Sequence, residues 1–354
     1  MPKQIYEDYW DLTLAWTDFN GKKFLNALKT VVDFIDLNKP VYYTKEYYRR
    51  LQLRLVGSLG LNETSIRKGI NEFVKLGFIN TQLLSYPSLT KDYLQAESDE
   101  ERQLIFSQIV YSNSSFRRSV TEDSSVREIN FVIKSIQEMG ELPISLLPAM
   151  ININISEYPQ GYITKQELEM KSQTEEVQSF AERKYNQADY LKNLLKKLDG
   201  VIYNNKTKSF VLGQESEQID IHKSRGTQGR DSYLQRLYKG KLQQESLQSC
   251  GQVKCMVEQL AYPSMIASHI KPYKDCNEIE AYDSNNGLLL SKNVDSLFDK
   301  YYISFDDEGK IIFYNRVPHD IKEAWKDYKV VPIYMNEARK KYLKIHRELC
   351  ETCN

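Results

Sequence analysis

Four polar residues in the C-terminal third of the chain have types and spacings suited to cutting a phosphodiester bond. They follow the order His269-x16-Asn286-x8-Asp295-x3-Asp299. A neutral histidine can take a proton from water near pH 7. Carboxylates are good ligands for Mg²⁺ or Mn²⁺, and such a cation can stabilise the leaving oxygen of a phosphate. An asparagine can hold the histidine or its loop through hydrogen bonds, so the set indicates metal-assisted hydrolysis.

A helix must position the two aspartates. The segment "SKNVDSLFD", residues 291–299, offers Ser291 or Asn293 as the N-cap. Asp295 and Asp299 are four residues apart and therefore share one helix face. Two like charges there repel by roughly a few tenths of a kcal/mol, and a divalent cation would relieve the repulsion. Taken singly, each aspartate could be an ordinary surface acid and His269 a loop histidine, but the ordered spacing favours a site.

The same stretch resembles the HNH (ββα-metal) nuclease family. The resemblance rests on "ASHIKPY" followed by "NNGLLLSKNVDSLFDKYYISFDDEGKI", and it covers about Gln248 to Tyr314. It implies a two-stranded ribbon and a helix around one metal ion, and hydrolysis of DNA by a one-metal mechanism. The HNH motif cuts with little sequence preference of its own, so the rest of the chain would have to supply specificity.

The resemblance also implies a role for each motif residue. His269 matches the general base, Asn286 matches the asparagine of the motif name, and Asp295 and Asp299 match the ligands of Mg²⁺ or Mn²⁺. Many relatives carry an acidic or histidine metal ligand directly before the base, where this chain has Ser268. This departure keeps open a DNA-binding regulator with a degenerate, non-catalytic HNH fold.

Four of the five cysteines form two short pairs, "CGQVKC" and "CETC". Cys250 and Cys255 precede the motif, whereas Cys350 and Cys353 lie near the C-terminus. Both spacings suit structural zinc half-sites, and a small motif with little core benefits from such a metal. We therefore predict a Zn²⁺ site from these four residues, with unliganded cysteines as the alternative. Cys276 matches no ligand position.

The first region, residues 1–150, is predicted to be mostly helical and to contain a winged-helix DNA-reading module. In "LNETSIRKGINEFVKLGFI", Asn62 is a plausible N-cap and Gly77 ends the helix before an extended run. The polar face of this helix would carry side chains that can reach base edges and phosphates, namely Thr64, Ser65, Arg67, Lys68 and Asn71. The alternative is a helical hairpin whose polar face is merely solvated.

Three further regions complete the predicted organisation. Residues 151–215 are predicted to form a second winged-helix-like module, because helices precede the hairpin pattern "VIYNNKTKSFVL". Residues 216–245 form a basic linker and the start of a helix, and residues 246–354 form the nuclease domain. Residues 221–254 hold seven lysines and arginines against two acids, which suits a phosphate backbone. Three lysines beside the motif could also contact phosphates: Lys271, Lys274 and Lys292.

Composition sets broader bounds. The chain has 354 residues, 48 basic and 48 acidic, so only local patches can indicate nucleic acid. The sequence has no run of eighteen apolar residues, so we expect no membrane span. The N-terminus does not resemble a signal peptide. We therefore expect a multidomain α+β protein acting in a reducing cytoplasm of prokaryotic type.

Together these features predict a type II restriction endonuclease that cuts double-stranded DNA. Each HNH motif makes one nick, so we expect a homodimer on a palindromic site and a cognate DNA methyltransferase as partner. Within nucleases, a modification-dependent enzyme or a homing endonuclease remains open.

Overall fold

The computed structural model describes residues 9–12, 14–213 and 230–353. The chain divides into two compact units, Met1–Gln214 and Glu215–Asn354, and each is considered by itself. Each combines helices with small antiparallel sheets, so the protein is α+β. Residues 216–229 of the predicted basic segment 216–245 lie outside those described.

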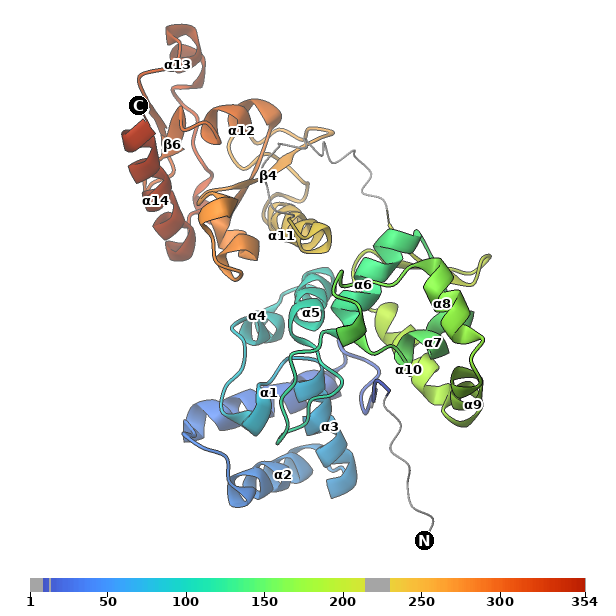
Figure 1. Ribbon diagram of the computed structural model, residues 1–354. Coiled ribbons are helices and arrows are strands. Elements are labelled where there is room, and N and C mark those ends of the chain that lie inside the picture. Colours follow the sequence, from blue (N-terminus) through green and yellow to red (C-terminus); the bar gives the residue numbers. More distant parts are fainter. Residues whose placement is uncertain (1–8, 13, 214–229, 354) are drawn as a thin grey trace. The chain divides into compact units, whose positions relative to one another are not determined.

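The first unit begins with a bundle of helices (Figure 1). Helices α2 and α3 are joined by a three-residue turn in which Gly60 has φ +65°. Asn62 caps α3, accepting a hydrogen bond from the Ser65 amide at 2.9 Å, as predicted. The elements are α1 (Lys22–Asn38), α2 (Lys45–Leu59), α3 (Glu63–Lys75), η1 (Thr81–Leu83), α4 (Leu89–Gln95) and α5 (Asp99–Asn113).

The expected wing after α3 is absent from the described structure. Gly77 has φ +86° and follows the helix as predicted, but the chain then forms η1 rather than a strand. The reason is that the two successive residues Phe78 and Ile79 are both buried in the helical core, whereas a wing strand would leave one face exposed. Phe78 packs on Phe24 at 5.7 Å between ring centroids. The prediction of an extended run at this place was therefore wrong.

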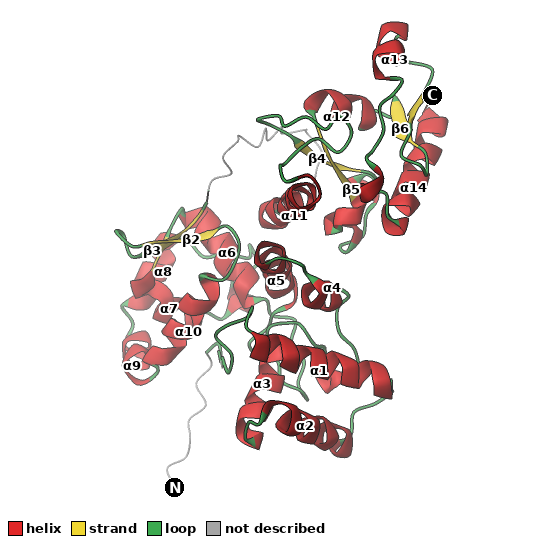
Figure 2. Ribbon diagram, turned by 180° about the vertical axis from the view of Figure 1, so that it is seen from behind, coloured by secondary structure: helices red, strands yellow, loops and turns green. Residues whose placement is uncertain are grey.

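A three-stranded sheet with the order β1-β3-β2 lies in the second half of this unit (Figure 2). The hairpin of β2 and β3 follows α10, and Val201 pairs with Leu212, so the predicted hairpin is confirmed. The elements are α6 (Glu128–Met139), β1 (Leu142–Pro143), η2 (Ile144–Leu146), α7 (Leu147–Ile151), η3 (Ile155–Glu157), α8 (Lys165–Ser172), α9 (Glu175–Arg183), α10 (Tyr185–Leu195), β2 (Val201–Asn204) and β3 (Ser209–Leu212).

The second unit places the two-stranded ribbon β4–β5 between helix α11 and helix α12, as both views show (Figure 2). The start of a helix predicted within residues 216–245 is confirmed: α11 begins at Ser232, and the Asp231 carboxylate caps it. The elements are α11 (Ser232–Cys250), β4 (Ile266–His269), η4 (Tyr273–Asp275), η5 (Glu280–Tyr282), η6 (Ser284–Asn286), β5 (Gly287–Leu290), α12 (Lys292–Phe298), β6 (Ile303–Phe305), β7 (Ile311–Phe313), α13 (His319–Trp325), η7 (Pro332–Tyr334) and α14 (Glu337–Cys353).

A buried arginine ties the ends of this unit together. The guanidinium of Arg339, on α14, is fully buried and donates to both carboxylate oxygens of Glu245 on α11, at 2.9 and 2.8 Å. It also donates to the backbone carbonyls of Tyr334 and Ser284. Such bidentate, charge-assisted bonds fix geometry, so α14 holds η6 and the turn before β5 against α11.

Among the described residues, no helix is both long and apolar enough to cross a membrane.

Candidate active site

Strands β4 and β5 with helix α12 form the framework of the predicted site. The strands pair antiparallel, with His269 opposite Gly287 and Ser268 opposite Leu288. All four residues of β5 are buried, which explains the apolar run after the Asn-Asn-Gly turn. Ser291 caps α12 by accepting a hydrogen bond from the Val294 amide at 3.3 Å. The two strands and the helix therefore have the ββα order that the sequence predicted.

A close approach between α11 and the ribbon requires glycine at position 287. A Cβ atom there would lie 2.1 Å from the hydroxyl oxygen of Tyr238, which is fully buried on α11. The hydroxyl of Tyr238 instead donates to the carbonyl of Asn286 at 3.0 Å. Because position 287 is a glycine, the side chain of Tyr238 can pack directly against the start of strand β5.

His269 lies in an aromatic surround. Its ring stacks on Tyr238 at 4.6 Å between centroids and 18° between planes. Tyr273 meets the same ring edge-on at 5.6 Å. The guanidinium of Arg230 lies over the ring of Tyr273 at 4.8 Å. These rings fix the plane of the imidazole and remove most of its water.

The hydrogen bond of His269 defines its tautomer. Nε2 lies 2.9 Å from the carbonyl oxygen of Ala281, in η5, and a carbonyl can only accept. Nε2 therefore carries the proton when the ring is neutral, and Nδ1 keeps the basic lone pair. Burial lowers the pKa of His269, and the positive charge of Arg230 lowers it too, while the Ala281 carbonyl and Asp299 oppose the shift. The imidazole is thus neutral at pH 7 and able to accept a proton.

Asn286 organises the loop between the two strands rather than the imidazole directly. Its side chain is fully buried, and its amide oxygen accepts the Lys271 backbone N–H at 2.7 Å. Its amide nitrogen donates to the Glu280 carbonyl at 3.1 Å and lies 3.2 Å from the Cys276 sulfur. Because Glu280 adjoins Ala281, these bonds also place the carbonyl that His269 uses.

The two aspartates lie one helical turn apart, Asp295 in the middle of α12 and Asp299 at its C-cap, and they differ in exposure. Asp295 is half-buried, whereas Asp299 is exposed at the C-cap. Burial raises the pKa of Asp295; the nearby Ser268 hydroxyl opposes this and the charge of Asp299 adds to it. The Ser268 hydroxyl oxygen is itself buried without a hydrogen bond of normal geometry among the described residues. The charge of Asp299 also opposes the lowered pKa of His269, so Asp299 lies near enough to act on both His269 and Asp295.

These donors fit a hard divalent cation better than zinc. Two carboxylates on one helix, with the Ser268 hydroxyl near Asp295, are oxygen groups of the kind Mg²⁺ and Mn²⁺ take. Mg²⁺ commonly uses one or two carboxylates plus water and phosphate. Among the described residues, no three His, Cys, Asp or Glu side chains lie together as a metal site. Asp295 and Asp299 are therefore the residues that would hold the cation, leaving the remaining positions to water and substrate.

The predicted four-cysteine zinc site is not assembled in the described structure. The sulfur of Cys250 lies 3.2 Å from the Tyr334 hydroxyl, and Cys255 accepts the Ser291 amide at 3.4 Å. Cys350 is buried in another environment, 3.5 Å from Nδ1 of His346, and burial raises the pKa of its thiol to about 12. Cys353 is exposed. The cysteines of the two pairs serve different packing environments, so the zinc prediction is not supported.

The lysines predicted to contact phosphate beside the motif differ in their availability. Lys271 forms a 2.7 Å ion pair with Glu280, inside the loop that Asn286 organises. Lys274 and Lys292 are exposed, on η4 and at the start of α12. The ammonium group of Lys271 is therefore engaged within this loop, whereas the exposed Lys274 and Lys292 remain candidates for binding phosphate.

The residues predicted to read DNA on α3 divide in the same way. Arg67 and Lys68 are exposed. Asn71 is half-buried, accepts the Val120 backbone N–H at 3.1 Å and donates to the Arg67 carbonyl at 3.0 Å. Its amide holds a loop in place, so it is occupied within the fold in a way that the helical spacing did not indicate.

Sequence reasoning missed the aromatic support of His269. Tyr238 and Tyr273 come from segments before and after β4, and a chain with 25 tyrosines gives no signal for these two. Arg230 was counted only as one charge of a basic segment. The Gly287 of the motif was the available signal, since a glycine inside a buried strand marks close approach of another group.

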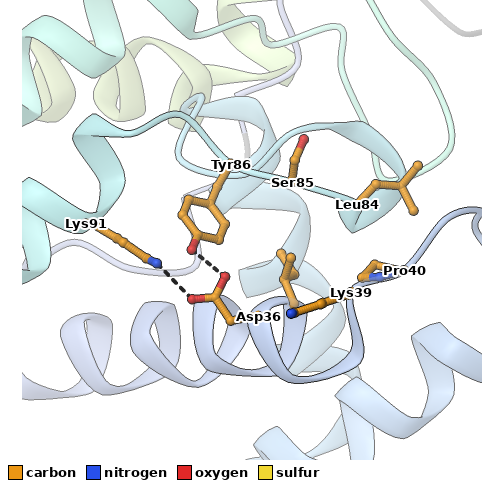
Figure 3. A pocket seen from close by; sticks show the side chains of 8 residues that line it. Asp36, Lys39, Pro40, Leu84, Ser85, Tyr86 and Lys91 are labelled. Carbon is orange, nitrogen blue, oxygen red and sulfur yellow. Dashed lines mark hydrogen bonds and ion pairs between the residues drawn. The ribbon is translucent and has the colours of Figure 1, made fainter.

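A pocket of about 480 Å³ lies in the first unit, at the C-terminal half of α1 (Figure 3). In it, the Asp36 carboxylate accepts the Tyr86 hydroxyl at 2.5 Å and pairs with the Lys91 ammonium at 2.9 Å. Tyr86 is the one aromatic residue that lines it, so this pocket lacks the stacked rings that would hold a flipped base.

Comparison with known proteins agrees with this geometry. Residues 255–306 match the HNH endonuclease family, and this segment includes β4, β5, α12 and β6. No curated protein matches the chain. The protein therefore carries an HNH endonuclease domain, a class of nuclease that acts on DNA. The match begins after α11, so Tyr238 and Arg230 lie outside it.

Proposed function

We propose that the protein is a metal-dependent endonuclease that hydrolyses the phosphodiester backbone of double-stranded DNA. The observation that carries the proposal is the position of His269. It is stacked on Tyr238, held by the Ala281 carbonyl and placed on strand β4, which packs against the helix that carries Asp295 and leads to Asp299. This segment matches HNH endonucleases.

In this proposal His269 is the general base. Its Nδ1 takes the proton of a water molecule as that water attacks phosphorus, and the Ala281 carbonyl stabilises the imidazolium that forms. Asn286 keeps Ala281 in position through the Glu280 carbonyl. A Mg²⁺ or Mn²⁺ ion held by Asp295 and Asp299 would supply charge stabilisation at the phosphate and at the leaving oxygen.

We further propose a restriction-type role, in which the first unit selects the DNA and the HNH domain cuts it. The exposed Arg67 and Lys68 of α3, with Lys274 and Lys292 beside the motif, are available for phosphate. A type II enzyme acting as a homodimer, protected by a cognate methyltransferase, remains our first choice. Cleavage of methylated and unmethylated phage DNA separates a modification-dependent enzyme from this choice. The length of the DNA footprint separates a homing enzyme, which recognises a longer site.

The test is DNA cleavage by the full chain with Mg²⁺ or Mn²⁺, beside His269→Ala, Asp295→Asn and Asp299→Asn. We expect His269→Ala to lower the cleavage rate by about 10²–10⁴-fold, which is the usual contribution of a general base. We expect both aspartate variants to need more metal for half-maximal activity. Asp327→Asn is the matched control, because this exposed acid lies in another part of the unit. Binding without cleavage on any substrate, at any metal concentration, would instead establish a non-catalytic regulator.

A further inference from the structure

A lysine-rich surface in the first unit has no role in the site described above. It is formed by the C-terminal part of α10 and by the β2–β3 hairpin that follows. Residues 192–208 contain five lysines and one acid in a chain whose net charge is zero. The lysines are Lys192, Lys196, Lys197, Lys206 and Lys208.

Two of these lysines converge on an aromatic ring. The ammonium of Lys196 lies 4.5 Å from the centroid of Tyr203, on β2, and that of Lys192 lies 5.9 Å from it. Lys192 and Lys196 are four residues apart on α10 and at its C-cap, so they share one helix face. Tyr203 is half-buried and rests on Phe210 of β3 at 5.2 Å. The ring therefore fixes where the two charges stand.

The turn of the hairpin adds two more positive charges to the same edge. Lys206 and Lys208 are exposed and follow Tyr203 by three and five residues. Among the residues that the structure describes, no acidic side chain forms an ion pair with any of the five lysines. The sheet's own acid, Glu141, lies beside β1 and bonds the Ser209 hydroxyl at 2.9 Å, so β3 separates it from β2.

Lysines also serve a simpler purpose next to an exposed strand. β2 is an edge strand, because the sheet order is β1-β3-β2, and charges beside an edge discourage pairing with another chain. That role does not require the charges to be gathered around a partly open ring. Two ammonium groups that converge on one partly exposed ring, with further lysines in the same hairpin and no ion pair to an acid, instead suit a phosphate backbone.

We propose that the α10–β2–β3 surface binds the phosphate backbone of duplex DNA and so holds the substrate of the nuclease. The choice of DNA as the ligand rests on the proposed function. Of the charged positions in this unit, this surface gathers more unpaired lysines than α3 presents with Arg67 and Lys68. We therefore assign to it a larger share of the sequence-independent affinity.

The experiment measures binding without cleavage. The full chain carrying His269→Ala is titrated against a fluorescent duplex in chelator, and the dissociation constant is followed as a function of salt. Each lysine that contacts phosphate contributes a slope of about 0.9 in log Kd against log salt, or about eightfold between 1 M and 0.1 M salt. Lys192→Gln/Lys196→Gln should thus reduce the slope by about two.

The matched control is Lys22→Gln/Lys23→Gln, which removes the same charge from exposed positions at the start of α1. We expect it to leave the slope unchanged, and we expect neither pair to lower the Tm. An unchanged slope in Lys192→Gln/Lys196→Gln, or an equal loss in the control, would overturn the inference. The inference would also be overturned if Lys192→Gln/Lys196→Gln bound RNA or phosphatidylserine vesicles less tightly but bound duplex DNA as tightly as before. Because chelator and His269→Ala abolish cleavage in every arm, a failure of the nuclease proposal is scored separately, in the cleavage assay.

Discussion

The surroundings of His269 suit the general-base role that we propose for it. Burial between Tyr238 and Tyr273 disfavours the imidazolium, and the carbonyl of Ala281 selects the tautomer. A base of this kind loses activity only when it becomes protonated, so a lowered pKa extends its working range toward acid. The same argument makes Arg230 a tuning residue, since its positive charge also disfavours the imidazolium.

We therefore predict that the acid limb of the pH profile of kcat/KM has a midpoint below 6.5, the ordinary value for histidine. Removing a neighbouring positive charge favours the imidazolium, so Arg230→Gln should move this midpoint upward. The measurement is the rate of nicking of supercoiled plasmid at saturating metal, at pH values on both sides of this midpoint. Arg236→Gln is the charge-matched control on α11. A midpoint that moves downward, or equally in both variants, would contradict the electrostatic assignment.

Tyr238 acts through His269 and is a positioning residue. Tyr238→Phe keeps the stacked ring but leaves the Asn286 carbonyl without that donor, a loss of about 1–3 kcal/mol in stability. Tyr238→Leu removes the ring as well. We predict that Tyr238→Phe lowers Tm while the acid-limb midpoint stays where it was, whereas Tyr238→Leu shifts that midpoint. If both variants changed Tm alone, Tyr238 would be merely structural.

At the scale of elements, α14 closes the HNH domain that the ribbon and α12 begin. His346 stacks on Phe298 at 3.9 Å, its Nε2 lies 3.2 Å from the Phe298 carbonyl and its Nδ1 lies 3.0 Å from the Ser304 hydroxyl. Arg339 joins the same helix to α11. These hydrogen bonds and ring contacts join α14 to α11, α12 and β6.

This closure gives a pH-dependent stability. Burial lowers the pKa of His346 to about 4, so the folded protein resists a proton that the unfolded chain accepts. Above pH 6.5 the lowered pKa of His346 does not change the free energy of unfolding, because the histidine is neutral in both states. As the pH falls from 6.5 toward 4, the free energy of unfolding decreases by up to about 3 kcal/mol. We predict that chemical denaturation shows this loss, and that His346→Gln removes much of the slope. His319→Gln, at an exposed position on α13, should keep it.

How far the sequence predicts these elements depends on how local their causes are. The caps Asn62 and Ser291 and the hairpin at Val201–Leu212 are set by neighbours in the chain, so local patterns predicted them. The ribbon with α12 was implied by the resemblance to HNH nucleases. The fate of the segment after Gly77 and the partners of the cysteines depend on distant contacts, such as Phe78 on Phe24 and Cys250 on Tyr334. No spacing reports those contacts. The extended run after Gly77 was therefore predicted wrongly, and the predicted zinc site finds no support among the described residues.

At the scale of the whole molecule, each unit completes its own core. In the second unit, Leu288, Val294, Phe298, Phe305 and Leu343 are all buried in one cluster drawn from β5, α12, β6 and α14. In the first, Phe24, Phe73 and Tyr93 pack edge-on around one centre. Units that each bury an apolar core of this kind can in principle fold alone.

We accordingly predict that DNA holding and DNA cutting separate when the chain is divided. Residues 230–353 should fold, nick DNA with divalent metal and do so with little sequence preference. Residues 9–213 should bind duplex DNA with the same dependence on Lys192 and Lys196, and should not cut. Thermal unfolding establishes folding of each fragment first, and footprinting and plasmid nicking then measure the two activities. A cutting fragment that kept the full chain's band pattern would contradict the division, because specificity would then belong to the HNH domain itself. A fragment that did not fold would also contradict the prediction, because its core would then depend on the other unit.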